Sequence, residues 1–456
     1  MSAGSLLGLA WLNLLYLASG AALLWWIRGW ATWAEVARLG GLAYIVGVAV
    51  VGTVWTELVV VGVPFELWTV LAVPAAAITV GVVASRRRRH GWPERRPIAL
   101  RRTAFVSAVG IAASGVLLEA MFRGARLSGL YWWDAWSFWV PKAKMLYLFG
   151  GIDEQLLASL ANSSYPPLIP ILDAAAFHAM GSPDVVTLHV QYWLFGVGFV
   201  WAFAGLLADR VPSWILWPFV LLVLVAPRVG RRFLVAEADL FLDFLFVIAA
   251  LLLVYWLLER KPWQLVVAAT LMSAIAVTKR EGLVLIAVLI VSAALVSLRE
   301  WRFVWPRLGA IVGVVALAAA PWRIWYVAHG IPGEGSPAGS ASAERLWPSM
   351  RLAFDVLFSS DYWSVIVPVA VGAIVLAAFA RQFVVAGFAA AAIVLVTLGG
   401  GLITYLIPEL PITQELGGNP IVRFMGAATL LCVATSPLLI ASAWKVATGP
   451  SEGPAP

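Results

Sequence analysis

The sequence predicts an all-α protein that crosses a membrane many times. Hydrophobic residues make up 62% of its 456 residues and charged residues only 12%, against roughly 45–50% and 25% in soluble globular proteins. Several apolar stretches exceed the roughly 20 residues that a membrane-spanning helix needs. A transmembrane barrel would instead show alternating segments of roughly ten residues, and the sequence contains none. We therefore expect an all-α polytopic membrane protein.

The apolar stretches predict about 13 transmembrane helices. They are expected near residues 4–27, 39–63, 67–84, 103–122, 186–208, 212–228, 239–258, 264–278, 282–298, 308–327, 362–380, 384–405 and 423–445. Between them we expect two long outer loops, at 123–184 and 328–361. Within the first loop, residues 140–160 predict one or two helices lying on the membrane, interrupted at Gly150-Gly151. The small residues of 333–343 predict a mobile segment, and those of 446–456 a disordered tail.

Cysteine and histidine usage excludes several kinds of site. The sequence contains one cysteine, Cys432, and four histidines. An intrachain disulfide and a thiolate metal cluster are therefore excluded. The histidines do not pair at metal-ligand spacing, so no zinc motif is predicted. The N-terminus lacks the basic start of a cleavable signal peptide, so we expect the first helix to be retained.

The strongest signal for membrane orientation is the basic loop 85–102, which contains four consecutive arginines, Arg86–Arg89. Short basic loops stay in the cytoplasm, so this loop is expected inside and the N-terminus outside. The net charge of +7 lies mostly in loops. We interpret it as topology and phosphate handling, and expect membrane lipids but no nucleic acid as partners.

The most informative stretch is YWWDAWSFWVPKAK at residues 131–144, which follows a predicted helix on the outer side. It contains one carboxylate, Asp134, among aromatic rings, with Trp136 and Lys142 close by. Trp favours the membrane–water boundary, because its ring is apolar and its N–H is polar. The alternative to a functional acid is an aromatic belt in which Asp134 is merely solvated.

Other charged residues fall at the same predicted outer face. Glu237 and Asp239 follow Arg231 and Arg232 where a loop enters a helix, and Lys279-Arg280-Glu281 lies between two apolar segments. An ionisable residue at a membrane helix end is a functional candidate, and outer cations suit a phosphate-bearing ligand. The alternatives are that Asp239 only caps its helix and that the cations only anchor lipid headgroups.

The order of these features resembles the GT-C superfamily of integral-membrane glycosyltransferases, in particular the branch of protein O-mannosyltransferases and lipid A aminoarabinose transferases. The matching features cover roughly 103–445. They are the loop acid Asp134, the surface helices, Tyr165-Pro166-Pro167-Leu168, the helix-starting acid Asp239, Thr278-Lys279-Arg280-Glu281-Gly282, and Arg423 at the start of a late helix. The sequence departs from many relatives at Ala135, where they carry a second acid, and at Tyr165, where they carry His or Lys.

The resemblance implies a GT-C-like fold and an inverting transfer of sugar from a polyprenyl-phosphate donor to a lipid, glycan or protein acceptor outside the membrane. Asp134 would be the general base and Asp239 a second catalytic acid. The expected substrate-binding residues are Lys279, Arg280, Glu281, Arg423, Arg231, Arg232, Tyr165, Glu237, Lys142 and Trp136. The departure at Ala135 leaves a divalent cation, Mg²⁺ or Mn²⁺, open as a cofactor.

We expect residues 1–102 to form three N-terminal helices and the basic loop, and 103–445 to form the catalytic core. The expected location is a bacterial plasma membrane, with the active site on the extracytoplasmic side. Two other functions stay open at this point. One is a transporter or lipid flippase, which would favour internal repeats and midplane sites. The other is a non-catalytic scaffold with a degenerate site.

Overall fold

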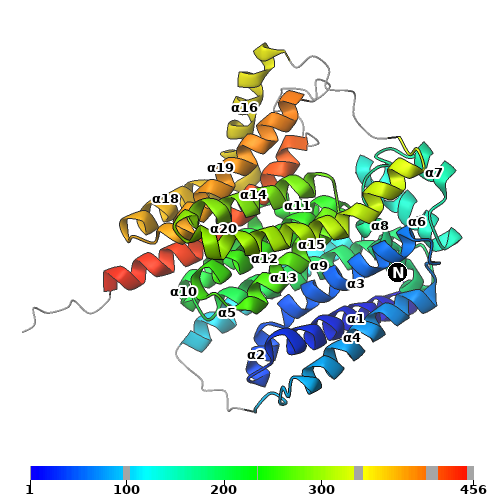
Figure 1. The fold of residues 1–456 in the computed structure, drawn as a ribbon, viewed down its shortest axis with the longest axis horizontal. Helices are drawn as coiled ribbons and strands as arrows, with labels where there is room; N and C mark the ends of the chain where they lie inside the picture. Colours follow the sequence, from blue (N-terminus) through cyan, green and yellow to red (C-terminus); the bar gives the residue numbers. More distant parts are fainter. Residues whose placement is uncertain (1, 96–102, 234, 333–341, 407–419, 449–456) are drawn as a thin grey trace, which may run out of the picture.

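A computed structural model describes residues 2–95, 103–233, 235–332, 342–406 and 420–448, and within these ranges the protein is helical, without a β-sheet (Figure 1). Nine of the described helices are long and apolar enough to cross a membrane. They are α1 (Ala3–Arg28), α3 (Gly40–Val60), α4 (Leu67–Arg87), α5 (Thr103–Ala125), α9 (Val185–Leu207), α12 (Ala238–Glu259), α15 (Trp301–Ala328), α19 (Phe383–Leu406) and α20 (Pro420–Thr448). The prediction of a multi-pass, all-α membrane protein is confirmed.

Every predicted spanning segment is helical in the structure, but four are shorter than the nine spans. These are α10 (Ser213–Val225), α13 (Pro262–Ala276), α14 (Glu281–Val296) and α18 (Ile366–Phe379). The predicted total of about 13 transmembrane helices therefore stays a prediction. The predicted mobile segment 333–343 and disordered tail 446–456 lie largely outside the described residues, as do 96–102 of the basic loop.

The first predicted outer loop contains more helix than expected. Asp134 leads into a π-helical turn (Ala135–Trp139), followed by α6 (Val140–Phe149) and α7 (Glu154–Ser159). Gly150 ends α6 in the left-handed conformation, at φ 67°, as the expected break between two short helices requires. The prediction of a loop as far as residue 184 is wrong, because α8 (Leu168–Met180) is a buried helix packed against α1 and α6. Tertiary packing stabilises this helix despite Asp173 and His178 within it.

The helix α12 forms the centre of the bundle. Its apolar 18-residue window is entirely buried, whereas only 11% of the corresponding window of α5 is buried. A helix that is apolar on all sides needs apolar neighbours on all sides, and α9, α13 and α20 supply them. Figure 1 shows the long helices lying side by side, with α6, α7 and α8 gathered at one end and α2 (Trp33–Arg38) at the other.

The three N-terminal helices pack closely together and against the rest of the chain. A Cβ atom on Gly20 of α1 would lie 1.7 Å from the carbonyl oxygen of Ala43, and one on Gly47 of α3 would lie 1.8 Å from that of Tyr16. Small residues thus let two membrane helices approach backbone to backbone. The helix α3 also packs against α9 and α13. The helices on either side of the division predicted at residue 102 therefore share one core.

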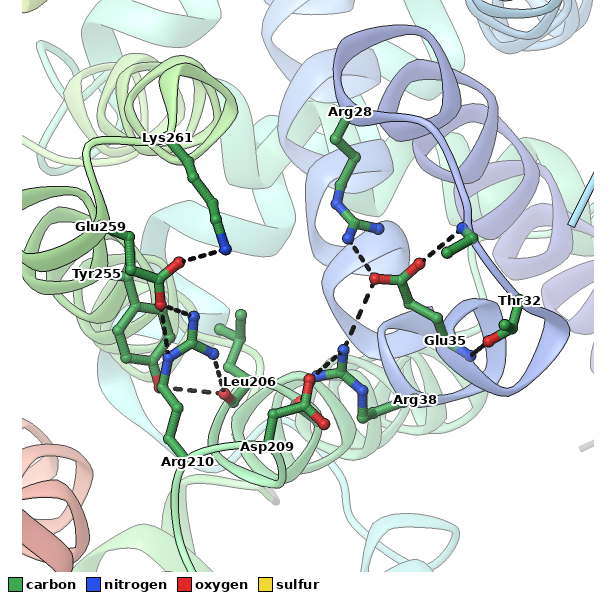
Figure 2. Close-up of polar contacts among 12 residues, drawn as sticks. Arg28, Thr32, Glu35, Arg38, Leu206, Asp209, Arg210, Tyr255, Glu259 and Lys261 are labelled. Atoms are coloured by element: carbon green, nitrogen blue, oxygen red, sulfur yellow. Dashed lines mark hydrogen bonds and ion pairs between the residues drawn. The ribbon is translucent and has the colours of Figure 1, made fainter. Parts of the chain in front are cut away.

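Opposite the end that carries α6 to α8, the bundle ends in alternating charges (Figure 2). Arg38 pairs with Asp209 at 2.6 Å, Lys261 pairs with Glu259 at 2.9 Å, and Arg28 pairs with Glu35. These pairs join the ends of α1, α2, α9 and α12, next to the Arg86–Arg89 run at the end of α4. The positive-inside rule predicts that this end faces the cytoplasm, and this orientation stays a prediction.

We expect the two ends of the bundle to lie on opposite sides of the membrane. In a variant lacking Cys432, a cysteine at exposed Ala158 of α7 should react with an impermeant maleimide in intact cells, and one at exposed Arg88 should react only after lysis. Ser163, on the same outer segment, is buried and serves as the matched position of low reactivity. Reaction at position 88 in intact cells would contradict the orientation.

Candidate active site

Candidate site residues that lie up to 289 positions apart in the sequence converge at one end of the bundle. Asp134 comes from the π-helical turn, Asp239 from the first turn of α12, and Lys279 from the turn between α13 and α14. Arg423 lies near the start of α20. Asp134, Asp239 and Lys279 are at most 7% exposed. The prediction that these residues share one face of the membrane is consistent with this convergence.

Asp239 is the centre of the charge network. Its Oδ1 accepts a hydrogen bond from Lys279 Nζ at 2.8 Å, and its Oδ2 lies 3.5 Å from Arg423 Nη1 and 3.9 Å from Arg232 Nη2. Asp239 contacts three cations from three elements, so its contacts are not those of a simple helix cap. Burying a carboxylate is costly unless it is paired and hydrogen-bonded, and here α11 (Pro227–Arg232), α20 and the turn before α14 each contribute a cation.

Asp134 is held by the same arginine. Arg423 Nη1 donates to Asp134 Oδ2, and Nη2 donates to Oδ1 at 3.4 Å. The planar guanidinium thus meets both carboxylate oxygens, as a forked Arg–carboxylate pair does. The π-helical turn directly after Asp134 is a backbone form found often at functional sites. Asp134 is therefore held in position within the network. The alternative, that Asp134 is merely solvated in an aromatic belt, does not describe it.

A second branch of the network runs through Lys279. Its ammonium lies 3.4 Å from Glu281 Oε1, to which the Tyr165 hydroxyl donates at 3.2 Å. Burial alone would lower the pKa of Lys279, but the negative charges of Asp239 and Glu281 raise it well above its ordinary value. Lys279 is consequently a permanent cation of the site.

Local backbone contacts bring the two short motifs together. Leu168 N–H donates to the carbonyl of Val277 at 3.1 Å, which ties the Pro166-Pro167 turn to the turn containing Lys279. Gly282 follows, and a Cβ atom there would lie 2.3 Å from the carbonyl oxygen of Ile275. Glycine is therefore required for α14 to leave α13 at this close angle.

The third branch contains Arg232 and Asp243. Arg232 Nη1 donates to Asp243 Oδ2 at 3.3 Å, and both side chains are buried. They lie against Gly426 of α20, where a Cβ atom would be 2.5 Å from Asp243 Oδ2. Asp243 is one turn beyond Asp239 on the same helical face, so α12 presents two carboxylates to the cations.

Beside the network lies a narrow hollow lined by four arginines. Its free volume of about 10 Å³ holds about one water molecule. The lining residues are Trp132, Arg228, Arg231, Arg232, Val235, Glu237 and Arg423. Within the described part of the chain, Arg232 Nε and Nη2 and Trp132 Nε1 are buried and donate no hydrogen bond. A hollow with this many cationic donors is suited to an anionic oxygen.

Glu237 differs from the other acids of the site. It immediately precedes α12 and is buried, and within the described residues its Oε1 accepts no hydrogen bond. Burial raises the pKa of Glu237 to about 7, and the negative charge of Asp239 adds to this effect. Glu237 can therefore gain or lose a proton near neutral pH, which suits acid–base chemistry.

Of the remaining predicted residues, some line the hollow or contact the charge network, and others lie apart from both. Arg231 lines the hollow with its side chain exposed, and Arg280 lies 5.0 Å from the centre of the Tyr165 ring. Lys142 is buried outside the network and donates to the carbonyl of Asn162. Trp136 is 51% exposed and does not line the hollow.

Three hollow-lining residues were absent from the predicted set, namely Arg228, Trp132 and the apolar Val235. Arg228 lies three positions before Arg231 and four before Arg232, a spacing that puts all three on one helical face. All three belong to α11 (Pro227–Arg232). Burial, together with the positive charge of Arg232, lowers the pKa of Arg228 to about 10. Trp132 lies in a stretch with three other tryptophans, and no sequence pattern distinguishes it from them. In the described ranges, no three His, Cys, Asp or Glu side chains form a group that could hold a metal ion.

Arg423→Ala should destabilise the protein by about 3–5 kcal/mol, the usual loss when one partner of a buried ion pair is removed. An arginine at a helix start opposes the helix dipole, which by itself would favour its removal. The ion pairs outweigh this effect, since Asp134 and Asp239 both pair with Arg423. Thermal unfolding in detergent measures the effect. Arg126→Ala, at an exposed arginine on the same end, is the control and should change little.

The stability of the protein should depend on Glu237 between about pH 4.3 and 7. An unfolded glutamate has a pKa of about 4.3, whereas that of Glu237 is raised to about 7. The folded state thus holds the proton more tightly, so its contribution is complete below about pH 4.3 and is lost as the pH rises through about 7. The thermal midpoint of wild type should fall more steeply across this range than that of Glu237→Gln. Exposed Glu66→Gln should follow wild type; parallel curves for all three would refute the assignment.

Comparisons with protein-family models, curated proteins and solved structures gave no match to this chain.

Proposed function

We propose that this protein is a GT-C-like glycosyltransferase that moves a sugar from a polyprenyl-phosphate donor to an acceptor hydroxyl at the extracytoplasmic membrane surface. The observation that carries the proposal is the arginine-lined hollow beside the Asp134–Arg423 pair. It combines hydrogen-bond donors that could bind a phosphate with carboxylates that could accept a proton. It lies at the end of a membrane bundle for which we propose about 13 spanning helices.

In this reaction the acceptor oxygen attacks the anomeric carbon while the bond from that carbon to the phosphate oxygen breaks. The electron pair of the broken bond stays on the lipid phosphate, and the acceptor proton passes to a carboxylate. Negative charge thus grows on the phosphate, where prearranged cations stabilise the transition state. Arg228, Arg231 and Arg232 supply those cations. A single displacement at carbon inverts its configuration.

Asp134 is the proposed proton acceptor. Its carboxylate is engaged by Arg423, and a donor phosphate with one oxygen in the hollow would compete for the same guanidinium. Donor binding would then loosen Asp134 for proton transfer. Glu237 is the second carboxylate suited to this role, because one of its oxygens lacks a hydrogen bond within the described residues and its pKa is raised to about 7.

An apolar hollow near the network could accommodate the polyprenyl tail. It has a volume of about 410 Å³ and lies between α16 (Ala343–Leu357), α18 and α19, with Cys432 of α20 at its wall. Leu398 lines it, and a Cβ atom on the next residue, Gly399, would lie 3.4 Å from the ring of Phe424, which follows Arg423. The tail could therefore stay among the helices while its phosphate reaches the arginines.

The location of the charges favours an enzyme over a transporter. Transporter sites lie near the bilayer midplane, whereas this network lies at the helix ends. A non-catalytic scaffold would keep the ion pairs but show no turnover, so activity decides between that function and the proposed one.

With polyprenyl-phosphate sugars as donors, the purified protein should form a glycosylated acceptor. Asp134→Asn should bind the donor but lose about 10²–10⁴ in turnover, the usual contribution of a general base. Arg231→Gln should weaken donor binding about tenfold, the loss of roughly one charge-assisted hydrogen bond. Binding and turnover are measured separately, by lipid-donor titration and by mass spectrometry of the product.

Arg126→Gln is the matched control for Arg231→Gln, because both arginines are exposed at the same end. It should leave both measurements unchanged. If Asp134→Asn retains turnover while Glu237→Gln loses it, the proton acceptor is Glu237. A wild-type protein that binds no polyprenyl-phosphate donor would exclude the proposed function.

A further inference from the structure

At the opposite end of the molecule, the N-terminal helices enclose an apolar groove of about 570 Å³. Small side chains of α1 and α3 form its floor, among them Ala18, Ala21 and Gly40, and indole rings border it, among them Trp11 and Trp201. Along α1 the groove runs from Trp11 to Ala21, a rise of about 15 Å at 1.5 Å per residue. That length is half of the roughly 30 Å hydrocarbon core, the depth of one leaflet.

A polar hollow of about 310 Å³ adjoins this groove at the end of α1. Trp30 lines both spaces, and its Nε1 donates to the carbonyl of Ala21 at 3.2 Å. Arg28, Glu35 and His90 line the polar space. The two spaces together therefore have an apolar part that reaches into the bilayer and a polar part at its surface.

Arg28 is the central cation of the polar hollow (Figure 2). Its guanidinium carbon lies 5.0 Å from the Trp30 ring centre and 5.1 Å from that of Trp263, and one of its nitrogens pairs with Glu35. Its Nε and Nη1 are buried and donate no hydrogen bond within the described residues. An unsatisfied buried donor destabilises the protein, so an acceptor arriving here would be favoured.

The hollow is also shaped to keep a second donor nearby. Gly29 has a φ of +74°, a conformation that glycine adopts readily, and a Cβ atom there would lie 3.0 Å from His90 Nδ1. His90 Nε2 is buried and lacks a hydrogen-bond partner in the described part of the chain. The glycine thus lets the imidazole lie directly against the end of α1.

The charge around the hollow is positive. The Arg86–Arg89 run follows α4, and Arg86 lies over the rings of Trp25 and Trp92 at 5.7 and 5.1 Å. The carboxylate of Glu35 is already engaged by Arg28 and by the backbone N–H of Ala31. Glu35 thus divides its negative charge between two donors, and an additional anion would meet cationic charge that is not fully neutralised.

We infer that this groove and hollow form a binding site for an anionic phospholipid of the leaflet at the Arg86–Arg89 end. One acyl chain would lie along Ala18 and Ala21, and the phosphate would accept hydrogen bonds at Arg28 and His90. The site is independent of the proposed glycosyl transfer. It assigns a role to the N-terminal helices, which would hold a lipid between α1, α3 and α9.

The test compares lipid retention by the purified full-length protein in native mass spectrometry. Dioleoyl phosphatidylglycerol and dioleoyl phosphatidylcholine have the same chains and differ in charge. Wild type should bind the anionic lipid about tenfold more tightly. Ala18→Phe fills the groove from an exposed position without touching an ion pair, and should reduce retention of the anionic lipid about tenfold. Ala316→Phe, at an exposed position of α15, should not.

The charge is tested with Arg28→Gln, which should remove the preference for the anionic lipid. Exposed Arg302→Gln at the same end of α15 should retain it. Inorganic phosphate alone should raise the thermal midpoint less than the lipid does, because it leaves the groove empty. If Arg28→Gln does not fold, the Ala18→Phe comparison still decides.

Equal binding of the two lipids, or unchanged retention in Ala18→Phe, would overturn the assignment. So would stabilisation by free phosphate equal to that by the lipid, since the groove would then contribute nothing. A dimer that forms through Ala18 and excludes lipid would identify a second copy of the chain as the occupant instead.

Discussion

The arrangement of the Asp134 end of the bundle depends on how the buried carboxylate of Asp239 is neutralised. Lys279, Arg423 and Arg232 approach it from three different elements, and each of these cations also pairs with a second acid. Because a buried charge without a partner costs several kcal/mol, the helix ends that carry these groups must converge. The network therefore fixes the positions of α11, α20 and the turn between α13 and α14 around α12.

The two ends of the bundle use charge differently. At the Arg86–Arg89 end, oppositely charged side chains alternate across the ends of α1, α2, α9 and α12 and leave few acids unpaired. At the other end, the acids and cations form one buried network beside a hollow in which Arg232 Nε and Nη2 donate no hydrogen bond within the described residues. The first arrangement neutralises the helix ends, whereas the second has donors left for an anion from outside. This contrast supports placing the chemistry at the Asp134 end.

The carboxylates of the site are not equivalent. Asp134, Asp239 and Asp243 each face a guanidinium or an ammonium within hydrogen-bond or ion-pair distance, whereas Glu237 shares the arginine hollow without a hydrogen bond to its Oε1 in the described residues. Environments that divide acids into paired and unpaired groups are how active sites assign acid and base roles. In the proposed reaction, Asp239 and Asp243 position the cations, and one carboxylate, Asp134 or else Glu237, takes up the proton.

Much of this protein follows from its sequence alone. Apolar length predicted the helices, and aromatic and charged residues at helix ends predicted Asp134, Asp239, Lys279 and Arg423 as site candidates. The orientation that the Arg86–Arg89 run indicates stays a prediction. Tertiary structure decided what those residues contact. The pairing of Arg423 with Asp134 joins positions 289 residues apart, and no local pattern encodes such a contact. The burial of α8, the exposure of Trp136 and the inclusion of Arg228 likewise depend on which helices become neighbours. The apolar composition of a segment determines whether it is buried away from water. Which buried charges pair is determined by how the helices pack in three dimensions.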